Sequence, residues 1–181
     1  MANGKGRVIA VLGAASLVGE PLVRRLVASG VGVLAYSRRA RPETDDDVRW
    51  RVIANAPVER VDCWISVAPL RVLSDHFAMI EASGARRLVQ LSSTSLFTKF
   101  DSAHPTEAAA ARHLIEDEAA LRTWAEGRGI GWTVLRPTLI YSAGRDRNFT
   151  EIARFIHRFG FFPLLGRADG LRQPVAAEDV A

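Results

Sequence analysis

A short apolar segment followed at once by a glycine-bounded loop constrains the fold of this chain more than any other feature. The segment Val8–Leu12 is apolar and rich in β-branched residues, which is typical of a strand buried on both faces of a parallel sheet. The loop Gly13–Gly19 follows, and Pro21 suits the first turn of a helix that Gly30 ends. A second strand is predicted at 31–36. Together these elements make a βαβ unit of about 30 residues, the building block of a doubly wound sheet.

The alternation of apolar segments and helical patterns continues along the chain. Further strands are predicted at 50–53, 63–67, 88–91 and 132–135. Helices are predicted around Leu73 to Ile80 with an end at Gly84, then over 106–127 and 149–159. We therefore predict an α/β fold with a Rossmann-type doubly wound parallel sheet.

The composition excludes several classes of protein. With 181 residues, 48% of them apolar, the chain can bury the core of one domain. Its single cysteine, Cys63, excludes an intrachain disulfide and a multi-cysteine zinc site, so we predict no metal and a reducing, cytoplasmic location. No segment reaches the roughly 18 apolar residues of a membrane span. The 22 arginines are dispersed and no recognition motif accompanies them, which disfavours nucleic acid as a partner.

The loop between the first strand and helix has the spacing of a dinucleotide-binding loop, with a serine in place of the middle glycine. Small residues let the backbone approach a pyrophosphate, and the free N–H groups at the helix start point at the anion. A serine hydroxyl near the phosphates can donate a hydrogen bond. A tight turn without a ligand is the alternative interpretation. We predict cofactor contacts from Gly13, Ala15, Ser16, Leu17, Val18 and Gly19.

The end of the second strand indicates which dinucleotide would bind. An acidic residue there would hold the ribose 2′-hydroxyl of NAD, whereas arginine would accept the 2′-phosphate of NADP. The sequence has Ser37, Arg38 and Arg39 at this point. We therefore predict NADP(H), with NAD as the alternative cofactor. The other interpretation is that these arginines are solvated surface residues.

Three further segments accompany the loop, in the order Leu91–Phe97 (LSSTSLF), Leu135–Tyr141 (LRPTLIY) and Arg172–Val180 (RQPVAAEDV). On these motifs the chain resembles an extended or atypical short-chain dehydrogenase/reductase, of the NAD-dependent epimerase/dehydratase or nucleoside-diphosphate-sugar epimerase group. The resemblance implies an NAD(P)-binding domain over 1–181, with 142–181 leading into the substrate-side region. It also implies a small-molecule substrate such as a sugar nucleotide, and a homodimer. The small substrate-binding portion usual in that family is expected to be truncated or absent.

The resemblance also assigns site residues. Ser93, or less directly Thr94, matches the serine that hydrogen-bonds the reacting oxygen of the substrate. Further cofactor contacts are implied at Val67, Ala68, Pro69, Ser92 and Pro137. The alternative for the serine cluster is that it only satisfies backbone groups at the end of a strand.

The catalytic Tyr-x-x-x-Lys pair that the resemblance implies is missing. No tyrosine lies between Tyr36 and Tyr141, and no lysine follows Lys99. His113, with Asp117 one helical turn later, is the candidate general acid, and a solvated i,i+4 pair is the alternative. Two hypotheses follow: an NADP(H)-dependent oxidoreductase or epimerase with an unusual proton donor, or a non-catalytic NADP(H)-binding redox sensor or assembly subunit.

Overall fold

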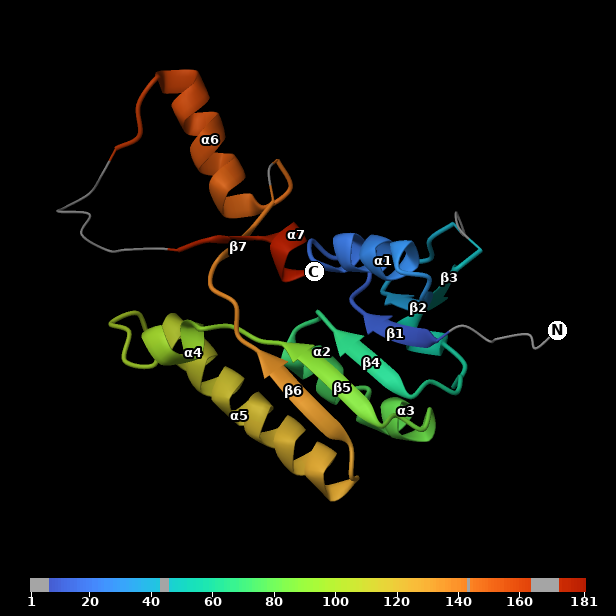
Figure 1. Cartoon of the computed structure of the whole chain (residues 1–181). Coiled ribbons are helices and arrows are strands. Elements are labelled where there is room, and N and C mark those ends of the chain that lie inside the picture. The colour runs from blue at the N-terminus through green and yellow to red at the C-terminus, as the bar shows by residue number, and fades with distance from the viewer. Residues whose placement is uncertain (1–6, 43–45, 143, 164–172) are drawn as a thin grey trace.

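The computed structural model describes residues 7–42, 46–142, 144–163 and 173–181. Its main sheet has six parallel strands in the order β3-β2-β1-β4-β5-β6 (Figure 1). The strands are β1 (Val8–Leu12), β2 (Gly32–Ser37), β3 (Val48–Val52), β4 (Cys63–Ser66), β5 (Arg87–Leu91) and β6 (Gly131–Leu135). This is the strand order of a Rossmann fold, with its switch point between β1 and β4. The predicted fold class is therefore confirmed.

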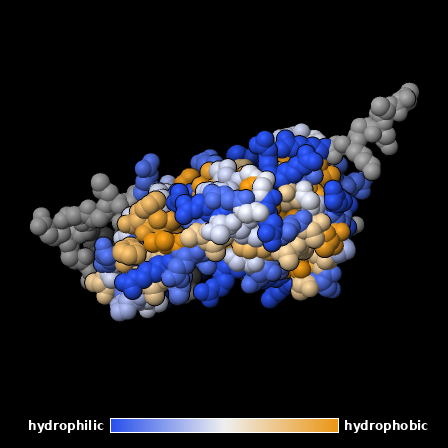
Figure 2. Space-filling model, turned by 90° about the horizontal axis from the view of Figure 1, so that it is seen from below, coloured by the Kyte–Doolittle hydropathy of each residue, from blue (hydrophilic) through white to orange (hydrophobic). Residues whose placement is uncertain are grey.

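Helices pack on both faces of the sheet. One face is covered by α1 (Gly19–Ala28), whose Leu22 and Val23 join the buried side chains of β1 and β2. The other face is covered by α2 (Leu70–Ser74), α3 (Phe77–Ala82) and the long α5 (Pro105–Gly127). The short helix α4 (Ser95–Thr98) follows β5 directly. Seen from below, the side on which α5 lies in Figure 1, hydrophilic and hydrophobic residues are interspersed (Figure 2).

The centre of the core lies under the ends of β2 and β4. The Tyr36 and Trp64 rings stack with centroids 5.1 Å apart, and both side chains are fully buried. The Trp64 indole N–H donates to the Ser83 hydroxyl at 2.9 Å, so its one polar atom is satisfied. This packing holds the carboxyl ends of two central strands in fixed positions, which matters because ligands bind at that edge of such sheets.

Part of the face on which α1 lies remains open. The side chains of β5 and β6 that point away from α5 are Val89, Leu91, Thr133 and Leu135, and they are half-buried or exposed. Leu135 alone is 46% exposed. Parallel sheets are usually covered on both faces, so this strip is an unusual surface among the described residues.

Two parts of the fold differ from the prediction. The single helix expected around Leu73 to Ile80 is two short helices, α2 and α3, separated at Asp75 and His76. A second, two-stranded parallel sheet pairs β7 (Ile140–Tyr141) with β8 (Val175–Ala176), and no such sheet was expected. The remaining elements are the 3₁₀ turn η1 (Ile53–Asn55), α6 (Arg147–Phe159) and α7 (Ala177–Val180).

No helix in the described part of the chain is long and apolar enough to cross a membrane.

Candidate functional site

The loop after β1 turns tightly against β2 and β4. Gly13 has a φ of 84°, and the N–H groups of Gly13 and Ala14 both donate to the Tyr36 carbonyl at 3.1 Å. A Cβ at Gly13 would lie 2.9 Å from the Ala68 backbone nitrogen. Glycine is therefore needed here for two reasons, the positive φ and the close approach of the segment that follows β4.

Ser16, which stands where many such loops have a glycine, closes the loop onto α1. Its N–H donates to the Gly13 carbonyl at 2.9 Å, and its hydroxyl oxygen accepts from the Gly19 N–H at 3.1 Å. The hydroxyl hydrogen stays available to donate to an oxygen of a ligand. A Cβ at Gly19 would lie 2.2 Å from the Gly13 carbonyl oxygen, so Gly19 allows the helix to pack against the loop.

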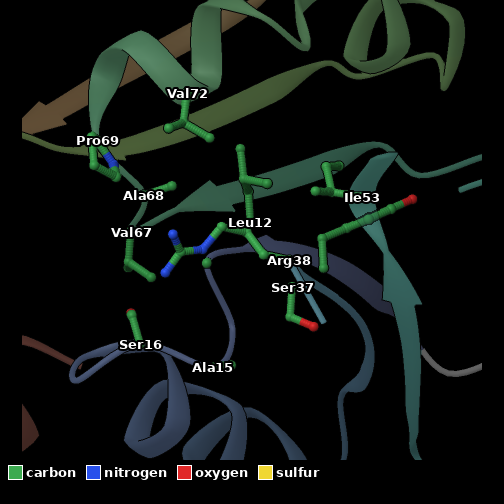
Figure 3. A pocket seen from close by; sticks show the side chains of 12 residues that line it. Leu12, Ala15, Ser16, Ser37, Arg38, Ile53, Val67, Ala68, Pro69 and Val72 are labelled. Carbon is green, nitrogen blue, oxygen red and sulfur yellow. The ribbon is translucent and has the colours of Figure 1, made fainter. Parts of the chain in front are cut away.

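A cavity of about 290 Å³ lies over this loop, and we call it the loop cavity. Its volume is near the lower bound of roughly 300 Å³ for small-molecule sites. In Figure 3 the guanidinium of Arg38 lies within it, on the side of Val67 and Ser16. The cavity is lined by Leu12, Gly13, Ala15, Ser16, Tyr36, Ser37, Arg38, Ile53, Val67, Ala68, Pro69 and Val72.

A second hollow, the arginine cavity, adjoins the first at the end of β2. It has a volume of about 410 Å³ and is lined by Ala15, Ser37, Arg38, Arg39 and Arg41. Ala15, Ser37 and Arg38 belong to both linings. Neither lining contains an acidic residue among the described residues, so the cavity offers guanidinium groups to an anion and nothing that repels one.

Arg41 is held in place from two sides. Its guanidinium pairs with Glu20 of α1 at 3.2 Å and lies 5.6 Å from the centroid of the Trp50 ring. Glu20 also pairs with Arg145 at 2.8 Å. The acidic residue next to the loop is thus already shared between two arginines, which reduces its repulsion of a nearby phosphate.

A third hollow, the serine cavity, lies at the end of β5 and has a volume of about 400 Å³. Pro69 lines both this cavity and the loop cavity, so the two are neighbours. Its lining consists of Pro69, Leu70, Arg71, Leu91, Ser92, Ser93, Ala110, His113, Leu114 and Asp117. The predicted substrate serine and the predicted general acid therefore line the same cavity.

Helix α5 presents two pairs of residues with i,i+4 spacing to the serine cavity. Ala110 and Leu114 form one pair, and His113 and Asp117 form the other. His113 is largely exposed, and its Nδ1 lies 3.3 Å from a carboxylate oxygen of Glu116. Apolar side chains therefore occupy one pair of cavity positions at the spacing of the missing dyad, and the other pair can exchange protons.

An ion pair joins the ends of β5 and β6 beside the serine cavity. The Ser92 hydroxyl donates to Glu118 of α5 at 2.5 Å, and Arg136 donates to both oxygens of the same carboxylate. Glu118 raises the pKa of the Arg136 guanidinium, because it accepts hydrogen bonds from the charged form. Arg136 also lies 5.7 Å from the centroid of the Phe97 ring. Ser92 is thus committed to this network rather than free for a ligand.

Several predicted residues line none of the three cavities. Val18 is buried, and neither Leu17, Val18 nor Gly19 belongs to these linings. Thr94 donates to the Pro137 carbonyl from both its N–H, at 3.0 Å, and its hydroxyl, at 3.3 Å. These two residues connect the ends of β5 and β6. Arg172 of the last sequence motif lies outside the described residues.

Four lining residues were not predicted. Arg41 and Arg71 carry a charge into the arginine and serine cavities, respectively. Ile53 and Val72 form apolar walls of the loop cavity. Arg41 lies two residues beyond Arg39, so its charge and position were a usable signal. The two apolar residues have no feature that distinguishes them from core residues in sequence.

No family model and no curated protein matches the sequence. Solved structures match the fold. UDP-glucose 4-epimerase from Thermotoga maritima superposes with a TM-score of 0.66 at 16% identity, over 96% of this chain and 70% of that one. A UDP-glucuronic acid 4-epimerase mutant from Bacillus cereus, solved with NAD and a fluorinated UDP-glucuronic acid, has a TM-score of 0.71 at 15% identity, over 96% and 70%.

This chain shares the fold of the sugar-nucleotide epimerases. MoeE5 in complex with UDP-glucuronic acid and NAD gives the same result, with a TM-score of 0.67 at 22% identity over 97% of this chain and 69% of that one. The epimerase fold extends over almost all of the chain and includes the three strand ends that carry the cavities.

Proposed function

We propose that this chain binds NADP(H) along the carboxyl edge of its sheet and presents it to a small hydroxyl or carbonyl compound, with a sugar nucleotide as the substrate class. The observation that supports this most is the order of the three cavities. The arginine cavity adjoins the loop cavity, and the loop cavity adjoins the serine cavity. A dinucleotide has the same order, with a phosphorylated ribose at one end, a pyrophosphate in the middle and the reactive ring at the other end.

The residues present fit such a ligand. The approach of backbone at Gly13 and the hydroxyl of Ser16 suit a pyrophosphate, and the small residues Ala15 and Ala68 leave room above the loop. When bound, the dinucleotide would supply hydride chemistry. The solved neighbours that contain NAD support a nicotinamide cofactor in this fold.

The preference for NADP(H) over NAD(H) rests on the arginine cavity. Arg38, Arg39 and Arg41 line it, and none of its described lining residues could accept a hydrogen bond from a 2′-hydroxyl through a carboxylate. We expect NADPH to bind more tightly than NADH in a fluorescence titration. Arg38→Asp should weaken NADPH by about tenfold or more and leave NADH little changed, because it removes a phosphate partner and adds repulsion.

Arg122→Asp is the matched control. Arg122 is exposed on α5 and lines none of the three cavities, so it carries the same change of charge without the contact. Equal weakening by the two variants would show that net charge, and not the arginine cavity, determines binding. Tighter binding of NADH than of NADPH would contradict the assignment directly.

The serine cavity is the proposed place of chemistry. Ser93 would hold the reacting oxygen of the substrate, and His113 would exchange its proton, with Asp117 as the second polar group of the pair. The charged groups around His113 are Arg71 and Asp117 in the cavity lining and Glu116 at 3.3 Å. His113→Gln should abolish turnover and its pH dependence while the NADPH dissociation constant stays the same. Unchanged turnover would exclude His113 as the proton donor.

A non-catalytic role is the second candidate, and Ala110 and Leu114 favour it. These apolar residues face the serine cavity with the spacing of a catalytic pair and cannot transfer a proton. A protein that binds NADPH but turns over no member of a panel of sugar nucleotides would be a redox sensor or assembly subunit. Failure to bind either dinucleotide would contradict both candidates.

A further inference from the structure

Helix α6 is well formed but lies apart from the main sheet (Figure 1). Asp146 caps its start by accepting a hydrogen bond from the Phe149 N–H at 2.7 Å. Gly160 ends it in the left-handed conformation, with a φ of 77°. None of the helix residues whose side chains are described is buried. The helix therefore has defined ends but lacks the packing that stabilises most helices in proteins.

The residues of α6 divide completely between two sides. At 100° per residue, all apolar positions fall on one side and the polar positions on the other. The apolar side consists of Phe149, Ile152, Ala153, Phe155, Ile156 and Phe159. Ile156 is 43% exposed and Phe159 is 53% exposed. This is the pattern of a helix that buries one face, yet the described chain offers nothing to bury it against.

Aromatic rings extend the apolar side beyond the end of the helix. The Phe155 ring lies 4.6 Å from that of Phe159, 5.9 Å from that of Phe161 and 6.0 Å from that of Phe162. Phe161 is 59% exposed and Phe162 is 43% exposed. We call α6 together with these two residues the α6 platform. Its rings form one connected cluster at the surface, not scattered exposed side chains.

The polar side of the platform is basic. The α6 sequence contains three arginines and one histidine against a single glutamate. Arg154, His157 and Arg158 lie on this side, with the last two in the final turn of the helix. A face rich in Phe with arginines on the opposite side is typical of helices that lie in the surface of an anionic bilayer.

We infer that the α6 platform docks on a membrane surface that carries anionic phospholipids. The rings would enter the boundary between headgroups and acyl chains, and the arginines would remain at the level of the phosphates. A second copy of this chain fits less well, because a two-fold contact between platforms would bring Arg154 and Arg158 close to their counterparts. The inference does not depend on the proposed cofactor.

Co-sedimentation of the full chain with vesicles tests the inference. We expect binding to phosphatidylcholine vesicles that contain phosphatidylserine, weaker binding to pure phosphatidylcholine, and loss of binding as salt is raised. Phe159→Ser should weaken binding by about tenfold or more, as expected for a buried aromatic ring. Arg154→Glu should weaken binding to anionic vesicles by about fivefold or more and leave binding to neutral vesicles unchanged.

Phe97→Ser is the matched control, because Phe97 is an even more exposed aromatic residue, at 69%, but lies on α4. Its substitution should leave vesicle binding unchanged. Circular dichroism of each variant checks that the fold is retained. No binding to anionic vesicles, or an equal loss with Phe97→Ser, would overturn the inference. A dimer in sedimentation velocity that Phe159→Ser converts to a monomer, without vesicle binding, would show that the platform is a protein interface instead.

Discussion

Replacing Gly13 with alanine tests how tightly the loop is built against the sheet. The φ of 84° costs an alanine about 1 kcal/mol relative to glycine. The new Cβ would also lie 2.9 Å from the Ala68 nitrogen and 3.3 Å from the Ala68 Cα and the Val67 carbonyl carbon. These are backbone atoms, so the segment after β4 must move, at a cost of about 1–3 kcal/mol. The expected loss of unfolding free energy is about 2–4 kcal/mol.

The chain supplies its own control for this prediction. Gly30 has a similar φ of 73°, but a Cβ built there would meet nothing within 4 Å. Gly30→Ala should therefore cost only the conformational term of about 1 kcal/mol. The difference between the two variants isolates the close approach of the loop to β4.

Urea unfolding followed by circular dichroism measures both variants. For a protein of this length, 1 kcal/mol corresponds to about 2–4 °C in Tm, so Gly13→Ala should melt roughly 4–16 °C below the wild type. NADPH affinity should fall only in Gly13→Ala, because Val67 and Ala68 also line the loop cavity. Equal destabilisation of the two variants would refute the claim that the loop and β4 are in close contact.

Two further predictions concern the buried polar groups behind the site. Burial raises the pKa of Tyr36 to about 12, with a smaller contribution from Glu59, whereas an unfolded tyrosine titrates near 10. The stabilisation from the neutral phenol is thus complete below about pH 10 and is lost as pH rises to about 12. Ultraviolet titration of Tyr141→Phe isolates Tyr36, and a pKa near 10 would contradict the burial argument. Gln90→Leu should destabilise the fold by about 1–3 kcal/mol in urea, because the buried Gln90 amide donates to the Ala68 carbonyl at 2.8 Å; an unchanged unfolding midpoint would show that this bond contributes nothing.

The elements predicted correctly are those whose signal is local and repeated. Val8–Leu12 is a strand as expected, because an apolar segment that ends at glycine is sufficient to define it. The predicted helix from Leu73 to Gly84 is wrong in part, since Leu73 and Ile80 both face the core although the chain changes direction at Asp75 and His76. Apolar spacing records which residues are buried, but not a change of axis between them.

Contacts between distant segments could not be predicted from such patterns. The β7–β8 pair joins Ile140 to Val175, and two residues per strand are too few to give a period. In the site, Arg38 and Arg39 were identified because a charge at the end of β2 has a chemical meaning. Ile53 and Val72 were missed because only the fold brings these apolar side chains together over the loop.

The two halves of the proposed site depend on different parts of the chain. The binding half depends on backbone: the loop turns at Gly13, closes through Ser16 and packs on the segment after β4. The chemical half depends on which side chains α5 presents to the serine cavity. Substitutions on one exposed helix face leave the loop geometry intact, so a protein can lose the dyad and retain its cofactor. Dinucleotide affinity and turnover are therefore separable properties of this chain, and only the second depends on His113.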